Sequence, residues 1–123
     1  MNEKIKLLIV DDEPSLRTIM KDELMQKGFD VKDAESGEDA LEILKKDRHQ
    51  IVILDVRMPE MDGLEVLKRI RANNLADKVI MLTGVDELKI AKNSLALGAN
   101  DFMTKPFQFR NLFACIERVM KEK

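Results

Sequence analysis

The residues best suited to chemistry in this chain are carboxylates that stand at the ends of apolar runs. Asp55 ends the apolar run 51–54, in which three of the four residues are β-branched. Such a run is typical of a strand buried on both faces, because a strand with one wet face would alternate polar and apolar residues. Asp11 and Asp12 follow a similar run at 5–10. Ligands of open parallel sheets bind outside the carboxyl ends of the strands, so these acids are candidates for one site.

Three carboxylates in one crevice repel each other, and positive charge must offset that repulsion. Lys105, which follows a short apolar segment at 102–103, supplies one such charge. A divalent cation would supply the rest, and an all-oxygen ligand set suits a hard ion such as Mg²⁺. Asp12 and Asp55 as direct ligands would leave coordination positions open for waters and for a phosphate oxygen.

A carboxylate in such a site can act as a nucleophile toward phosphorus and form an aspartyl phosphate. Phosphoryl transfer depends mainly on positioning and on charge neutralisation. The hydroxyl of Thr83, which follows the apolar run 79–82, could donate a hydrogen bond to a phosphoryl oxygen, and Lys105 could neutralise another. Taken alone, Asp55 could equally cap a turn. The grouping as a whole holds a nucleophile, a metal and two donors, with no evident base aimed at a substrate.

Strand and helix patterns alternate along the chain and give five βα units. Apolar runs or alternation predict strands at 5–10, 29–32, 51–55, 79–82 and 102–103. Apolar residues at helical spacing predict a helix after each strand, marked among others by Leu16, Ile19, Met20, Leu24, Leu88, Ala91 and Leu95. Expected helix-capping residues are Ser36, Asp62 and Asp86 at N-termini and Gly28 and Gly98 at C-termini. The alternation predicts an α/β fold, a (βα)5 doubly wound parallel five-stranded sheet with helices on both faces.

Length, charge and cysteine content narrow the class of protein. The 123 residues suffice for one domain, which we expect over 1–123. The net charge of −2 means that no overall basic field attracts nucleic acid or an anionic membrane. One cysteine, Cys115, cannot form an internal disulfide, which favours a cytoplasmic location and a packing role for the thiol. No apolar run approaches the ~20 residues that span a bilayer, and residues 1–4 lack a signal-peptide layout. His49, the only histidine, is expected at the surface.

Five motifs in order resemble those of the receiver domains of two-component response regulators, across essentially the whole chain. They are VDDEP at 10–14, LDVRMP at 54–59, MDG at 61–63, LTG at 82–84 and GANDFMTKPF at 98–107. The resemblance implies a flavodoxin-like receiver fold and a signalling function, not an enzyme in the usual sense. Such a domain accepts a phosphoryl group from a sensor histidine kinase or a histidine phosphotransfer protein, and catalyses only its own phosphorylation and dephosphorylation.

The resemblance also implies a metal site built around the phosphoacceptor. Asp55 would accept the phosphoryl group and bind Mg²⁺. Asp12 would bind the ion directly, Asp11 would hold it through water, and the backbone carbonyl of Arg57 would be a further ligand.

A switch is implied in the second half of the chain. Thr83 would be the switch hydroxyl, Lys105 the phosphoryl-binding ammonium, and Phe102 the aromatic that rotates inward. The surface from the fourth to the fifth helix would then meet a downstream partner or output domain, with a phosphorylation-dependent homodimer as one form of response. A cis bond between Lys105 and Pro106 is also implied.

Two features of the sequence should affect the rates of phosphorylation and dephosphorylation. Gly84 follows the switch threonine where the family more often has alanine, and glycine loosens the loop. Arg57 and Val85 would flank the phosphoryl group, and our hypothesis is that they tune the access of water and hence the lifetime of the phosphoryl group.

Three other functions fit the sequence less well. A flavodoxin-type cofactor binder needs glycine, serine and threonine donors after the first strand, where the acids 11–13 would repel phosphate. A hydrolase of the haloacid dehalogenase type needs an acid two residues after its nucleophile, where this chain has Arg57. A receiver that works without phosphorylation would not need the whole set of site residues. A receiver cut from a longer DNA-binding regulator or hybrid kinase stays open, although this domain itself is expected to bind neither nucleic acid nor membrane.

Overall fold

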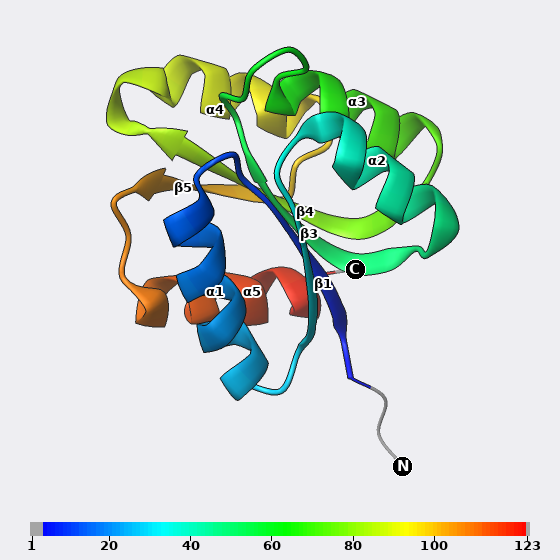
Figure 1. The fold of residues 1–123 in the computed structure, drawn as a ribbon. Helices are drawn as coiled ribbons and strands as arrows, with labels where there is room; N and C mark the ends of the chain where they lie inside the picture. The colour runs from blue at the N-terminus through cyan, green and yellow to red at the C-terminus, as the bar shows by residue number, and fades with distance from the viewer. Residues whose placement is uncertain (1–3, 123) are drawn as a thin grey trace.

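A computed structural model describes residues 4–122, in which strands and helices alternate from end to end (Figure 1). The elements are β1 (Lys6–Val10), α1 (Pro14–Gln26), β2 (Asp30–Ala34), α2 (Gly37–Lys46), β3 (His49–Asp55), α3 (Gly63–Ala72), β4 (Ala76–Gly84), the 3₁₀ turn η1 (Val85–Glu87), α4 (Leu88–Ala96), β5 (Asp101–Lys105) and α5 (Phe109–Lys121). The strands form one parallel sheet in the order β2-β1-β3-β4-β5. The predicted doubly wound (βα)5 fold is confirmed. The predicted domain also includes residues 1–3 and 123, which lie outside the described residues.

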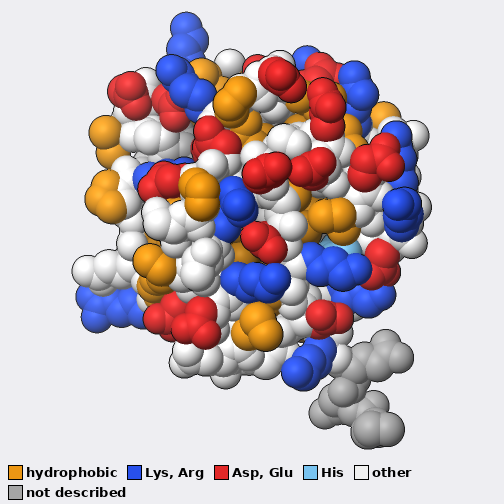
Figure 2. Space-filling model, in the orientation of Figure 1, with side chains coloured by type: hydrophobic (Ala, Val, Ile, Leu, Met, Phe, Trp, Pro, Cys, Tyr) orange, Lys and Arg blue, Asp and Glu red, His pale blue; other side chains and the backbone are white. Residues whose placement is uncertain are grey.

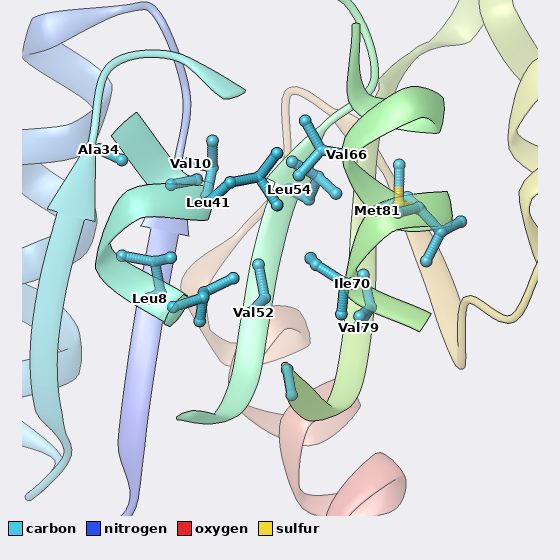
Figure 3. Packing of buried hydrophobic residues seen from close by; sticks show 14 of the residues in the cluster. Leu8, Val10, Ala34, Leu41, Val52, Leu54, Val66, Ile70, Val79 and Met81 are labelled. Atoms are coloured by element: carbon cyan, nitrogen blue, oxygen red, sulfur yellow. The ribbon is translucent and has the colours of Figure 1, made fainter. Parts of the chain in front are cut away.

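Helices α2, α3 and α4 cover one face of the sheet, and the core on this side is aliphatic (Figure 1). Leu8, Val52 and Val79 lie side by side on β1, β3 and β4 because the register pairs them directly. In the same cluster, Ile70 of α3 lies beside Val79, and Leu41 of α2 lies between Val10 and Leu54 (Figure 3). Full burial of such a side chain contributes roughly 1.5–3 kcal/mol to stability, so this layer fixes the two helices on the sheet.

Helices α1 and α5 cover the opposite face, which the alternate residues of the same strands supply (Figure 1). Leu7 and Ile51 point this way and pack with Leu24 of α1 and Ile116 of α5, all four at most 2% exposed. The central strands are therefore buried on both sides, as their unbroken apolar runs predicted.

His49 is not a surface residue, which corrects the sequence-based expectation. It is the first residue of β3, 1% exposed, with Nδ1 2.7 Å from the carbonyl oxygen of Asp47. Strand β4 begins at Ala76, three residues before the apolar run that predicted it, and Ala76 pairs with His49. This pairing extends both strands and draws the histidine inward.

Three apolar helix residues used to predict α1 and α4 face solvent. Ile19, Leu88 and Leu95 are 51%, 43% and 42% exposed. The helices lie where they were predicted, but neighbouring residues on a helix are rotated by about 100°, so only part of a broad apolar stripe can touch the sheet. In α1 the buried positions are Met20 and Leu24.

Most predicted helix ends are confirmed. Ser36 and Asp62 accept hydrogen bonds from the backbone N–H three residues on, at 3.2 and 3.0 Å, contacts that stabilise a helix by about 1 kcal/mol each. Gly28 and Gly98 have φ of 97° and 109°, the left-handed conformation of a helix C-terminus. The prediction of Asp86 as a cap is wrong: Asp86 is exposed, and the acid that binds the backbone there is Glu87.

Gly63 ties the start of α3 to the end of β3. Its N–H donates to the carbonyl oxygen of Val56 at 2.8 Å. A side-chain carbon on Gly63 would overlap the carbonyl oxygen of Asp55 and come within 2.8 Å of Val56 Cα. The backbone of Asp55 is therefore held in place by a contact that only glycine permits.

We expect Gly63→Ala to lower the free energy of unfolding by roughly 1–3 kcal/mol, the usual cost of overpacking a rigid site. Urea denaturation followed by circular dichroism measures it. Lys68→Ala, an exposed change in the same helix, should stay within about 0.5 kcal/mol of the wild type. Equal effects of the two substitutions would contradict the close packing of Gly63.

Candidate functional site

Three charged side chains meet at the carboxyl edge of the sheet. Asp11 directly follows β1, Asp55 ends β3, and Lys105 ends β5. The ammonium Nζ of Lys105 lies 2.8 Å from Asp11 Oδ2 and 3.3 Å from Asp55 Oδ2. Asp11 is 0% and Asp55 6% exposed, so one cation bridges two buried carboxylates.

Asp12 adds a third carboxylate to this edge. Asp11, Asp12 and Asp55 each offer an oxygen, and these oxygens all lie within 4.8 Å of one another. Asp12 is exposed, which leaves one side of the cluster open to water. The backbone N–H of Arg57 donates to Asp55 Oδ1 at 3.2 Å and helps to orient that carboxylate. An all-oxygen set with an open, wet side fits Mg²⁺, which keeps several of its waters when bound.

The electrostatics of the cluster follow from burial. Burial, helped by the nearby charge of Asp11, raises the pKa of Asp55 from 3.8 to about 6, although Lys105 and the Arg57 N–H act in the opposite direction. Burial lowers the pKa of Lys105, but the carboxylates of Asp11 and Asp55 outweigh it and the net shift is upward. Lys105 is therefore a cation at neutral pH, and the carboxyl group of Asp55 beside it loses its proton at a higher pH than an ordinary aspartate does.

The remaining predicted residues lie on β4 and β5. Thr83 is 0% exposed, and its hydroxyl donates to the carbonyl oxygen of Gly84 at 2.9 Å. Phe102 is half-buried and packs against the core under α3 and α4. The hydroxyl of Thr83 is thus engaged with the backbone of the loop that follows β4. The Lys105–Pro106 peptide bond is cis, as the resemblance implied.

Glu87 is a residue of this region whose place the sequence did not predict. It is 7% exposed, Oε1 accepts a hydrogen bond from the N–H of Gly84 at 2.9 Å, and Oε2 forms an ion pair with Nε of Arg57. The neighbouring acids Asp86 and Glu87 give the same local signal. Only the 3₁₀ turn η1 decides that the first faces water and the second faces the loop.

Cys115 packs in the core, as predicted. It is 3% exposed, and its Sγ lies 3.6 Å from Asp101 Oδ2. Burial, with a smaller contribution from Asp101, raises the pKa of the thiol to about 11. The thiol is therefore protonated and unreactive at neutral pH.

The surface carries both signs of charge. Acidic and basic side chains are interspersed on the face seen in Figure 2, without a continuous basic area on that face. Among residues 4–122, no helix combines the length and the apolar character needed to cross a membrane.

The raised pKa of Asp55 predicts a pH-dependent loss of stability in metal-free protein. A folded-state pKa of about 6 against the usual 3.8 means that ionised Asp55 destabilises the fold by roughly 3 kcal/mol above pH 6, and not at all below about pH 4. We therefore expect Asp55→Asn to raise the free energy of unfolding at pH 7.5 in chelator, by roughly 1–3 kcal/mol, and to lose that gain at pH 4. Denaturation at the two pH values measures it. A pH-independent difference would show that Asp55 ionises normally.

Comparison with known proteins agrees with this geometry. Residues 7–117 match the family model for the response regulator receiver domain. The chain is 40% identical, over 98% of its length, to the alkaline phosphatase synthesis transcriptional regulatory protein PhoP of Bacillus subtilis, of which it covers 50%. It is 35% identical over 95% of its length to the transcriptional regulatory protein TrcR of Mycobacterium tuberculosis, of which it covers 46%. The chain thus spans about half the length of these curated relatives.

Solved structures share the fold over nearly the whole chain. The receiver domain of NtrX from Brucella abortus superposes with a TM-score of 0.90 at 28% identity, covering 95% of this chain and 99% of that one. The chemotaxis protein CheY4 of Vibrio cholerae superposes with a TM-score of 0.89 at 32% identity, with the same coverage. Family match, shared fold and the acidic edge of the sheet agree: this chain belongs to the response regulator receiver domains of two-component signalling.

Proposed function

We propose that Asp55 accepts a phosphoryl group from a phosphohistidine on a sensor histidine kinase or a histidine phosphotransfer protein. The observation that carries this proposal is the ammonium of Lys105, held between the buried carboxylates of Asp11 and Asp55. With a pKa of about 6, Asp55 is mostly ionised at neutral pH and can attack phosphorus. The bond from phosphorus to Asp55 forms as the bond to the donor imidazole breaks, and the electron pair of the broken bond stays on that ring nitrogen.

The neighbouring groups have distinct tasks in this proposal. Lys105 neutralises a phosphoryl oxygen from the position it already holds beside Asp55. The Arg57 N–H, which already donates to Asp55 Oδ1, is directed at the same region. Thr83 must exchange its present bond to Gly84 for one to the phosphoryl group, which makes it the switch hydroxyl.

Mg²⁺ supplies charge neutralisation and orientation for the phosphoryl oxygens when it is bound. We assign it to Asp12 and Asp55 directly, to the backbone carbonyl of Arg57, and to Asp11 through water. The proximity of the three carboxylates and the exposure of Asp12 support this assignment. Asp11 already holds Lys105 and the N–H of Glu13, which suits an indirect role.

The response surface proposed here comprises α4, β5 and α5. Movement of Thr83 makes room for Phe102, now half-buried, to rotate inward. Leu88 and Leu95 expose apolar surface on α4 and are available to a partner, an output domain or a second copy of the chain. PhoP and TrcR are named transcriptional regulators, and we propose an output of that kind for the protein that carries this receiver. The cytoplasm, where such partners act, is the proposed location.

Incubation with acetyl phosphate and Mg²⁺ should add one phosphoryl group, seen as a single mass increment in the intact protein. Asp55→Asn and an excess of chelator should each abolish the adduct, because the nucleophile or the charge neutralisation is lost. The adduct should be stable in acid and labile in base, as an acyl phosphate is. An adduct that persists in Asp55→Asn would contradict the assignment of the phosphoacceptor.

The metal assignment predicts a loss of affinity on neutralising the exposed ligand. Asp12→Asn should weaken Mg²⁺ binding by roughly 10-fold or more, since one of few direct anionic ligands is removed. Titration followed by backbone amide NMR measures it. Asp22→Asn, an exposed acid on α1, is the matched control and should bind Mg²⁺ as the wild type does.

A further inference from the structure

Glu87 lies between the two loops that border the phosphorylation site. Its carboxylate holds the N–H of Gly84 with one oxygen and the guanidinium of Arg57 with the other. Arg57 comes from the loop after β3 and Glu87 from the turn after β4, so the ion pair joins the two loops. Among the described residues, Oε2 of Glu87 accepts no hydrogen bond and has Arg57 as its ion-pair partner.

The partners of Glu87 are donors that face the same edge of the sheet as Asp55. The backbone N–H of Arg57 already donates to Asp55 Oδ1 at 3.2 Å, so its side chain begins beside the phosphoacceptor. Gly84 directly follows Thr83, the switch hydroxyl of the proposed function. Arg57 and Glu87 also line a groove of about 350 Å³, together with Val56 and Leu64. The carboxylate of Glu87 thus binds an N–H and a guanidinium, the groups that proteins use to bind phosphate.

We propose that Glu87 is an internal anion that engages Arg57 and the Gly84 N–H in the unphosphorylated protein, and that a phosphoryl group on Asp55 takes these donors from it. The proposal rests on the proposed function of Asp55 and extends it to a residue that controls the switch. Glu87 acts through Arg57 and the loop, and is a positioning residue rather than a catalytic one.

The exposure of the two partners sets the direction of the exchange. The side chain of Arg57 is 73% exposed and that of Glu87 8%, so the guanidinium is free to turn while the carboxylate is enclosed. A phosphoryl group carries about −1.5 to −2 charges and three acceptor oxygens, and a guanidinium binds such a group with two parallel hydrogen bonds. Once Arg57 leaves, Glu87 is a buried carboxylate without a cation beside a second anion. Its expulsion would move η1 and the start of α4.

Gly84 fits this arrangement. A side-chain carbon there would lie 2.9 Å from Asp86 Oδ1 and 3.2 Å from Glu87 Oε1. Glycine at this position leaves room for the Glu87 carboxylate to lie close to the loop, and a side-chain carbon there would require small shifts of both acids.

The test compares rates of phosphorylation by acetyl phosphate in saturating Mg²⁺, followed by intact mass. Glu87→Gln keeps an oxygen for the Gly84 N–H but releases Arg57, and should be phosphorylated at least about fivefold faster, the lower end of usual coupling between sites. Asp86→Asn, the matched loss of charge at the exposed neighbour, should stay within about twofold of the wild type. Arg57→Gln should remove the gain, so that Arg57→Gln/Glu87→Gln is no faster than Arg57→Gln alone.

A structural readout accompanies the rates. Without any phosphoryl donor, Glu87→Gln should shift the backbone amide resonances of residues 83–88 toward their positions in the phosphorylated wild type, and Asp86→Asn should not. Equal acceleration by Glu87→Gln and Asp86→Asn, or a gain that survives in the Arg57→Gln background, would overturn the proposal. A wild type that takes up no phosphoryl group would instead contradict the proposed function, and this result is visible before any variant is compared.

Discussion

The rest of this receiver depends on the repulsion between the carboxylates of Asp11 and Asp55, which the ammonium of Lys105 partly offsets. Two carboxylates less than one-tenth exposed lie at the ends of adjacent strands, Asp11 just after β1 and Asp55 at the end of β3, and the ammonium contacts both. The arrangement is only partly balanced, because the pKa of Asp55 remains raised to about 6. Surplus negative charge of this kind suits a divalent cation, which is why the proposed phosphorylation includes Mg²⁺. Because of this excess negative charge, a bound cation would change the electrostatic energy of the unphosphorylated site.

The rest of the fold serves to hold these charges at one edge. Aliphatic layers on both faces fix β1, β3 and β4, so the ends of these strands cannot drift apart. Gly63 locks the backbone of Asp55 against the start of α3. The β4–α4 segment is held differently, by polar contacts of Thr83 and Glu87 with the backbone of Gly84. Apolar packing thus gives the site its rigidity, and exchangeable polar contacts give it a part that can move.

Sequence reasoning was most successful where one signal dominated. Unbroken apolar runs predicted the central strands correctly. Since the carboxyl ends of parallel strands lie at one edge of the sheet, the sequence also predicted that Asp11, Asp55 and Lys105 lie close together. It failed where tertiary contacts decide. His49 is drawn into β3 by pairing with Ala76, and Ile19 faces water because a helix buries only part of its apolar stripe. Glu87 was missed because local pattern does not say which of two adjacent acids turns inward.

The contact between Lys105 and Asp11 spans 94 positions of the chain, and this has a consequence for folding. Lys105 lies on β5, an edge strand paired only with β4 and half-buried throughout. Contacts between residues far apart in the chain cost loop-closure entropy before they add stability, so they slow folding. A copy in which β5 has not docked lacks the bridging ammonium, so Asp11 and Asp55 face each other without the cation that partly offsets their repulsion. The phosphorylation proposed at Asp55 would therefore require the docked edge strand, and an incompletely folded copy would take up no phosphoryl group.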